Sequence, residues 1–173
     1  FGRGVVFELS PSQRAIWLDQ NLFPEAPLYN IGMVTRLDGD VDIAILQQAI
    51  NLVANSNEAL LLRMKATQGL PVQYLVDQIA VNLSVVDFTG RSDARAIALS
   101  YLGESFNSPF QLFDQPLWDS RLVRVDNRTY YWLNRFHHLI FDGYSIGLFL
   151  KEVAHTYGRL HSKAEYVRVQ GVS

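Results

Sequence analysis

The most informative stretch of the chain is residues 130–144, which read YYWLNRFHHLIFDGY. Its first half is rich in aromatic and branched side chains and predicts a β-strand, and a helix is expected from Tyr144 to about His161. Alternate side chains of a strand point to opposite faces. One face then carries Trp132, Asn134, Phe136 and His138, and the other carries Tyr131, Leu133, Arg135 and His137. Only one of the two histidines can face a given cleft.

The strand ends in the pattern His-His-x-x-x-Asp-Gly, formed by His137, His138, Asp142 and Gly143. This pattern should arise by chance about once in a few thousand chains of this composition. It lies between a strand and a helix, where α/β proteins expose side chains to a crevice. We therefore predict His138 as the catalytic residue and His137 as a hydrogen-bonded core histidine. Asp142 is expected to cap the final helix and Gly143 to allow a sharp turn, so both support the loop beside His138.

Other histidine chemistry has little support in the sequence. Adjacent histidines diverge on a strand and no third ligand is in reach, so we predict no metal site. The chain has no cysteine and no Gly-x-Ser-x-Gly element, which excludes thiolate nucleophiles and argues against a serine hydrolase. His155 and His161 are expected on the surface of the last helix.

The rest of the chain alternates between strands and helices. Helices are predicted from Ser10-Pro11 to Phe23, from Asp42 to Asn55 and from Ser92 to Phe106, the last with Ala96, Leu99 and Leu102 on its buried face. Strands are predicted for Tyr29–Leu37, Leu60–Met64, Val72–Val76, Leu83–Phe88, Arg121–Val125 and Tyr130–Phe136. Turns are expected at Gly69-Leu70-Pro71 and at Asp126-Asn127-Arg128, where Asn127 tolerates positive φ. In the final helix, Ile146, Leu148, Leu150, Val153 and Tyr157 are available for burial. The fold class is α/β, a two-layer sandwich with a mixed β-sheet and packed helices.

The composition of the chain limits which partners it is expected to bind and where in the cell it is expected. The 173 residues are 49% hydrophobic, with 15 basic and 17 acidic side chains and no block of one sign. This balance predicts no nucleic-acid partner and no binding to an anionic membrane. No apolar run approaches the roughly 20 residues that span a bilayer, so a soluble cytoplasmic protein is expected. The chain begins at Phe1 without Met, and we predict that it belongs to a longer protein.

Several motifs in order resemble the condensation domains of non-ribosomal peptide synthetases, which have a chloramphenicol-acetyltransferase-like fold. Besides the histidine motif, the resemblance rests on Leu9–Trp17, Tyr29–Ile31, Leu37–Asp42, Asn57–Leu60, Pro109–Leu112 and Pro116-Leu117. It implies that residues 1–173 are the N-terminal subdomain of such a domain and that the C-terminal subdomain is absent. The 130–138 stretch also resembles siderophore synthetases of the enterobactin type.

The resemblance implies a reaction and a set of partners. An acyl or peptidyl thioester on one carrier protein would be joined to the amine of an aminoacyl thioester on another, with His138 as the catalytic residue. No cofactor is expected on the chain itself, because the substrates travel on the phosphopantetheine of partner carrier proteins. The other implied partners are the C-terminal condensation subdomain and an adenylation domain. Two alternatives stay open, a catalytically silent carrier-docking module and an acyl-CoA-dependent acyltransferase of the same fold.

One residue departs from the family pattern. The family usually has Arg directly after the leucine that corresponds to Leu60, and that Arg pairs with the motif Asp, whereas this chain has Leu61. Arg63 lies two residues further along the predicted strand and Arg135 lies in the motif strand. We hypothesise that one of these two arginines takes over the pairing with Asp142.

Overall fold

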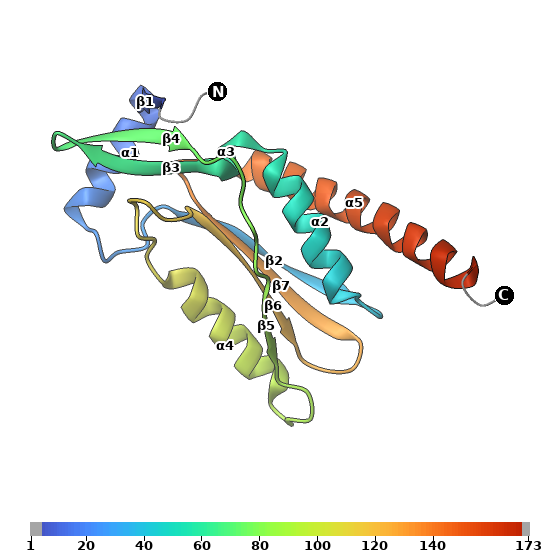
Figure 1. Cartoon of the computed structure of the whole chain (residues 1–173). Coiled ribbons are helices and arrows are strands. Elements are labelled where there is room, and N and C mark those ends of the chain that lie inside the picture. Colours follow the sequence, from blue (N-terminus) through green and yellow to red (C-terminus); the bar gives the residue numbers. More distant parts are fainter. Residues whose placement is uncertain (1–4, 171–173) are drawn as a thin grey trace.

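The computed structural model describes the backbone of residues 5–170 and the side chains of residues 5–162. These residues form two sheets (Figure 1). The larger sheet has the strand order β2 (Asn30–Asp38), β7 (Thr129–His137), β6 (Trp118–Arg124) and β5 (Ser84–Asp87). β5 runs parallel to β6, whereas β2–β7 and β7–β6 are antiparallel. The predicted mixed sheet is therefore confirmed.

The smaller sheet has the order β1 (Val6–Glu8), β4 (Leu70–Leu75) and β3 (Leu62–Thr67). The predicted hairpin is confirmed, but its turn comes earlier than expected. Gln68 and Gly69 adopt positive φ angles of 51° and 79°, the conformation that suits a tight two-residue hairpin turn. Leu70 and Pro71 consequently belong to the strand.

Two helices begin at the caps that the sequence predicts. Ser10 and Gln13 form a reciprocal capping box at the start of α1 (Pro11–Leu22), and Asp42 caps α2 (Ile43–Asn55). α4 spans Ala94–Asn107 and α5 spans Gly143–Gln170. The side chains of Ser10 and Asp42 each satisfy a backbone N–H that the first helical turn leaves without a partner. None of the helices in the described part of the chain is long and apolar enough to cross a membrane.

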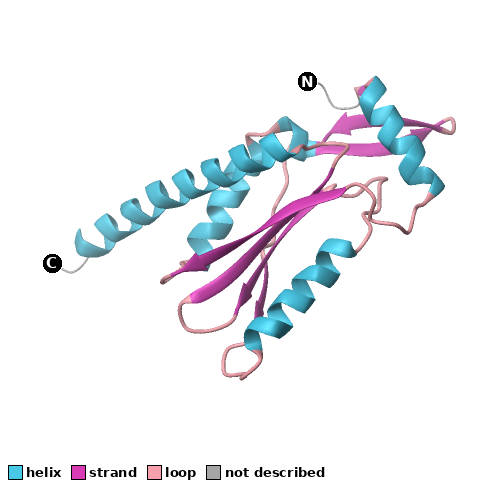
Figure 2. Ribbon diagram, turned by 180° about the vertical axis from the view of Figure 1, so that it is seen from behind, coloured by secondary structure: helices cyan, strands magenta, loops and turns pink. Residues whose placement is uncertain are grey.

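Helices cover both faces of the larger sheet (Figures 1 and 2). On one face α2 and α5 pack over Trp118, Leu122, Trp132 and Phe136. On the other face α4 packs over Val123, Tyr131 and Leu133. The alternation predicted for β7 is confirmed, and the mixed α/β fold with packed helices is confirmed with it. The predicted number of layers is wrong, because helices on both faces of the sheet make three layers rather than two. Because both faces of β7 are covered, nearly all of its side chains are buried.

The structure corrects the predicted buried faces of two helices. In α4, Ala96 and Leu99 are exposed, and the buried residues are Ala94, Ala98, Leu102 and Ser105. This helix has apolar residues around much of its circumference, so its contact with the sheet decides which side is buried. In α5, Leu148 is 44% exposed, and its neighbour Phe149 enters the core instead.

Two local predictions are also wrong. Leu60 and Leu61 lie in a short helix, α3 (Glu58–Leu61), rather than in a strand, because the Asn57 side chain accepts the N–H of Ala59 and starts a helical turn. Asn127 does not have positive φ. The β6–β7 turn is held instead by the Asp126 carboxylate, which accepts the N–H of Arg128 at 2.8 Å.

Strands β2 and β7 approach closely at Gly32, which pairs with Arg135. A Cβ added at Gly32 would lie 2.5 Å from the carbonyl oxygen of Asn134, a clash with backbone that no rotamer change relieves. We expect Gly32→Ala to lower the free energy of unfolding by about 3 kcal/mol, as overpacking of a rigid core does. Gly103→Ala is the matched control, since a Cβ there meets open space on α4 and alanine favours a helix. Chemical denaturation of both variants checks this, and equal stabilities would contradict it.

Candidate functional site

The motif loop connects the end of β7 to the start of α5 and is held by backbone hydrogen bonds. His137 N–H donates to the carbonyl of Leu117 at 2.8 Å, and His138 N–H donates to the carbonyl of Tyr29 at 2.9 Å. Leu139 is buried in a third cluster with Leu9, Met64 and Leu117, which joins the smaller sheet to the loop. The Gln13 side chain also donates to the carbonyl of Leu139. The loop is therefore fixed from several elements at once.

His138 is exposed, and its ring orientation is set by one contact. Nδ1 lies 2.8 Å from the carbonyl oxygen of Phe141. A carbonyl oxygen can only accept a hydrogen bond, so Nδ1 must carry the hydrogen. In the neutral ring the lone pair is then on Nε2. His138 thus presents a proton acceptor to the outside of the fold, which suits the predicted catalytic residue.

The Phe141 carbonyl that orients His138 is fixed by a group of aromatic rings. The Phe141 ring stacks on Phe136, with centroids 4.5 Å apart, and meets the edge of Phe149 at 6.4 Å. Both partners are buried in the main core. Sequence reasoning missed Phe141, since it occupies a variable position of the motif and acts through its backbone. Only its aromatic character hinted at burial.

His137 is a core residue, as predicted, with 1% of its surface exposed. Its Nδ1 accepts the N–H of Leu139 at 3.2 Å, so the neutral ring carries its hydrogen on Nε2. That Nε2 is buried and has no hydrogen-bond partner among the described residues, while Tyr29 and Phe110 flank the ring. Burial, and then repulsion from His138, lowers the pKa of His137 to about 4. His137 is therefore neutral near pH 7.

Asp142 caps α5, as predicted, by accepting the N–H of Ser145 at 2.8 Å. The hydrogen bonds from Ser145 lower the pKa of the Asp142 carboxyl, and the neighbouring His138 acts in the same direction. Gly143 is the first residue of α5. It does not adopt positive φ, and a Cβ there would meet open space, so the predicted turn role is not what requires glycine at this position.

The hypothesis that an arginine pairs with Asp142 is wrong. Arg63 donates to the carbonyls of Leu60 and Leu62, and Arg135 forms an ion pair with Asp119 at 2.7 Å. Leu61 belongs to a helical turn, so it does not lie on the same strand as Arg63, contrary to the prediction from the sequence. Asp142 is held by the backbone at the start of α5 instead.

Arg135 organises the surroundings of His137 rather than of Asp142. Its Nη1 donates to the carbonyls of Ser105 and Ser108, each at 2.6 Å, and so ties the end of α4 to β7. Its guanidinium lies 4.4 Å from the centre of the Phe110 ring, which in turn contacts His137. The sequence showed Arg135 on the same strand face as His137, but it did not show these partners.

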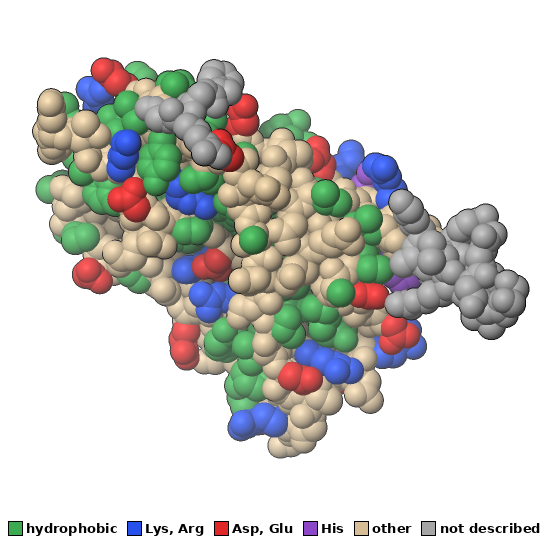
Figure 3. Space-filling model, in the orientation of Figure 1, with side chains coloured by type: hydrophobic (Ala, Val, Ile, Leu, Met, Phe, Trp, Pro, Cys, Tyr) green, Lys and Arg blue, Asp and Glu red, His purple; other side chains and the backbone are tan. Residues whose placement is uncertain are grey.

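The two remaining histidines take surface positions on α5. His155 is exposed, and His161 is half-buried with its ring stacked on Tyr157. Within the described part of the chain, no three His, Asp or Glu side chains gather in a way that would hold a metal ion. Acidic and basic side chains are interspersed on the face seen in Figure 3.

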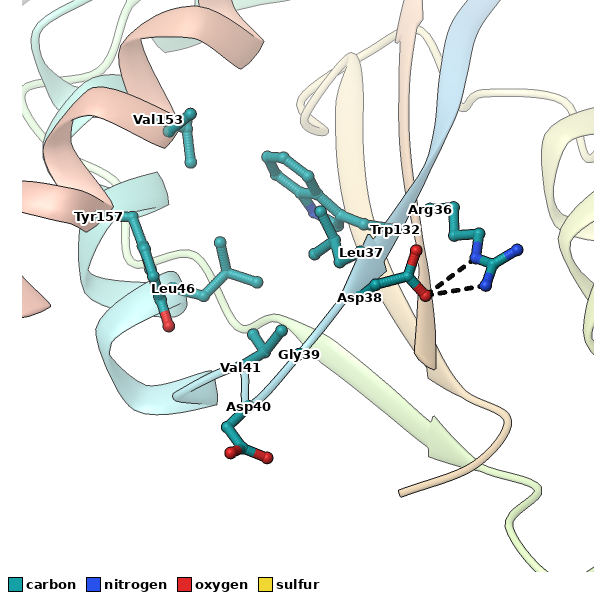
Figure 4. A pocket seen from close by; sticks show the side chains of 11 residues that line it. Arg36, Leu37, Asp38, Gly39, Asp40, Val41, Leu46, Trp132, Val153 and Tyr157 are labelled. Atoms are coloured by element: carbon teal, nitrogen blue, oxygen red, sulfur yellow. Dashed lines mark hydrogen bonds and ion pairs between the residues drawn. The ribbon is translucent and has the colours of Figure 1, made fainter. Parts of the chain in front are cut away.

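A separate pocket of about 390 Å³ lies near the other end of β7 (Figure 4). Trp132 projects into it between α5 and α2, and Leu37, Val41, Leu46 and Val153 line it with Tyr157. Trp132 is six residues from His138, which corresponds to about 20 Å along an extended strand. This pocket is therefore distinct from the motif, and its lining holds no histidine.

Comparison with known proteins places the motif in a family. The family model described as condensation domain matches residues 5–172. A linear gramicidin synthase of Brevibacillus parabrevis is 34% identical over 86% of this chain, and the dimodular nonribosomal peptide synthase of Bacillus subtilis is 29% identical over 89%. The chain spans 3% and 6% of the length of these two relatives.

Solved structures agree with this assignment. The starter condensation domain of the rhizomide synthetase RzmA has a TM-score of 0.87 and 29% identity over 92% of this chain, which covers 39% of that domain's chain. The first condensation domain of the CDA synthetase shares the fold, with a TM-score of 0.82 at 24% identity. With the family model matching almost every residue, this chain belongs to the condensation domain family.

Proposed function

We propose that the chain supplies the catalytic histidine of a condensation domain that forms amide bonds in non-ribosomal peptide synthesis. The observation that carries the proposal is the geometry of His138, whose Nδ1 is engaged by the Phe141 carbonyl and whose Nε2 is left with a lone pair on an exposed ring. One relative is named a linear gramicidin synthase and another a nonribosomal peptide synthase, which supports the same reaction class. A mutant of the RzmA starter domain was solved in complex with C8-CoA and Leu-SNAC, which supports a site for an acyl donor and an amine.

The proposed reaction transfers an acyl or peptidyl group from a thioester to an amine. The amine nitrogen attacks the thioester carbonyl, the C–N bond forms and the C–S bond breaks. The ammonium form of a free α-amine has a pKa of about 8 and first loses one proton to solvent, which leaves the nitrogen lone pair free to attack. After the attack, His138 Nε2 accepts a second proton from that nitrogen and passes it to the departing thiolate. The first N–H groups of α5, around Gly143, lack intrahelical acceptors and can stabilise charge on the carbonyl oxygen.

The partners follow from this reaction. Donor and acceptor arrive on the phosphopantetheine arms of carrier proteins, so the chain itself needs no cofactor, and tethering raises their effective concentration. An adenylation domain would load the carriers, and the C-terminal condensation subdomain would complete the site. We place the synthetase in the cytoplasm. The siderophore type suggested by residues 130–138 stays a prediction about the product.

A silent docking module is the second candidate, and one observation favours it. The arginine that pairs with the motif Asp in the family is replaced by Leu61, and neither Arg63 nor Arg135 takes its place at Asp142. Such a module would bind loaded carriers without joining their cargo.

A single-turnover assay of the parent synthetase, with loaded donor and acceptor carriers, tests the proposal. We expect an amide product that depends on both carriers. Carrier binding without amide would instead indicate the docking module. Product formation from free acyl-CoA without any carrier, together with no product from loaded carriers, would indicate the acyl-CoA-dependent acyltransferase. Either of these two results would overturn the proposal.

A further inference from the structure

Arg63 lines a small pocket of about 290 Å³ that is separate from the histidine motif. The pocket lies between the start of β3, the start of β6 and the segment 79–82. β5 pairs with β6 only at residues 121–124, so residues 118–120 of β6 extend beyond that pairing. The lining residues are Arg63, Ile79, Ala80, Val81, Asn82, Pro116, Trp118, Asp119 and Ser120.

The Arg63 guanidinium is a buried charge without a carboxylate partner. The residue is 7% exposed, and within the described part of the chain its hydrogen bonds go only to the carbonyl oxygens of Leu60 and Leu62. Both of these bonds use Nη1, so Nε and Nη2 keep their hydrogens available. Burial lowers the pKa of Arg63, and nearby Tyr74 opposes the shift. Burying a cation is costly unless an anion compensates it, so the pocket favours an anionic occupant.

Asp119, the acidic residue in the lining, is engaged elsewhere. Its Oδ2 lies 2.7 Å from Arg135 Nε, and its Oδ1 lies 3.3 Å from Arg121 Nε. Two arginines outside the pocket lining therefore share this one carboxylate, and none of the bonds of Asp119 goes to Arg63, the cation of the lining.

Ser120 supplies a second donor on the same pocket. Its Oγ accepts the indole N–H of Trp132 at 2.8 Å, and the residue is 4% exposed. Since that oxygen already acts as acceptor, its own hydrogen can donate to a ligand. Trp118, Pro116 and Val81 supply apolar lining next to these polar groups. A guanidinium can bind a carboxylate through two parallel hydrogen bonds in one plane.

We propose that this pocket binds a small organic carboxylate. The Arg63 guanidinium and the Ser120 hydroxyl hold the carboxylate, and the aliphatic part of the ligand lies against Trp118. The site does not depend on the proposed amide-bond chemistry, because none of the motif residues lines it.

Titration of the 173-residue chain with acetate and butyrate tests the proposal, at constant ionic strength maintained with chloride. The Arg63 Nε–H resonance in ¹H–¹⁵N NMR is the readout. We expect a saturable shift and a butyrate affinity several-fold above that of acetate, because butyrate adds apolar contact. Absence of saturation would overturn the proposal. Tighter binding of inorganic phosphate than of butyrate would also overturn it.

Two variants and a matched control test which residues hold the ligand. Binding is followed at the Ser120 backbone amide, except in Ser120→Ala, where the Arg63 Nε–H resonance is followed. Arg63→Met keeps a long side chain without charge and should weaken butyrate at least tenfold. Ser120→Ala should weaken butyrate binding several-fold. This variant still tests the proposal if Arg63→Met does not fold. Arg14→Met removes an arginine whose side chain is 58% exposed and should leave the affinity unchanged. Unchanged affinity in Ser120→Ala and in any folded Arg63→Met protein would refute the site, as would equal weakening in Arg14→Met.

Discussion

Replacing His138 by alanine in the parent synthetase is expected to lower the single-turnover rate of amide formation by about 10²- to 10⁴-fold, the usual contribution of a positioned general base. The reason is geometric, since the Phe141 carbonyl fixes the ring and leaves Nε2 as the acceptor. Because His138 is exposed, the variant should fold like the wild type. Rapid-quench kinetics with loaded carriers measures the rate, and thermal unfolding measures the stability.

Two further variants separate catalysis from folding. His155→Ala removes an exposed histidine from α5 and should change neither the rate nor the stability. Asp142→Ala removes the cap of α5 and should cost about 1 kcal/mol of stability, so that its effect on the rate comes mainly through the fold. If all three variants lost soluble protein to the same extent, this distinction would fail.

Acidification from pH 7 to pH 4 is expected to remove about 3 kcal/mol of stability through His137 alone. The pKa of this residue falls from 6.5 in an exposed state to about 4 in the folded chain. The unfolded chain therefore binds the proton first, and stability begins to fall below about pH 6.5. The loss from this group levels off below about pH 4, where the folded chain binds the proton too, and each pKa unit corresponds to about 1.4 kcal/mol. The physical cause is the cost of charging a ring that is 1% exposed.

Urea unfolding of the chain between pH 7 and pH 4 measures this effect. His137→Asn removes the titrating ring but keeps an amide oxygen that can accept the N–H of Leu139. Between pH 7 and pH 4, this variant should lose about 3 kcal/mol less unfolding free energy than the wild type. His155→Asn, at an exposed position, should keep the wild-type pH dependence. A His137→Asn profile parallel to that of the wild type would show that another group causes the loss.

Local signals in the sequence predicted most of the elements correctly. Ser10 with Gln13 and Asp42 mark helix starts because their caps bind backbone groups within three residues. The alternation along residues 130–138 showed that His137 and His138 point to opposite sides, since the pleat has a period of two. These interactions span only a few residues, so the sequence alone contains them.

Predictions that depended on distant segments were less reliable. The buried face of α4 could not be predicted from Ala96 and Leu99, because the helix is apolar on several sides and contact with the sheet selects one. Either Arg63 or Arg135 was expected at Asp142, but both bind carbonyl or carboxylate partners elsewhere. The partners of a long charged side chain depend on which segments the fold brings within its reach.

By itself the sequence determined the α/β fold, the family and the identity of the motif histidines, since repeated local patterns and an ordered set of motifs carry that information. The tertiary structure alone decided which nitrogen of His138 is free. That choice depends on the Phe141 carbonyl, which is held in place when the Phe141 ring packs against Phe136 and Phe149. It also decided that Arg63 has no carboxylate partner within the described part of the chain, because the fold buries this residue away from Asp142 and commits Asp119 to two other arginines.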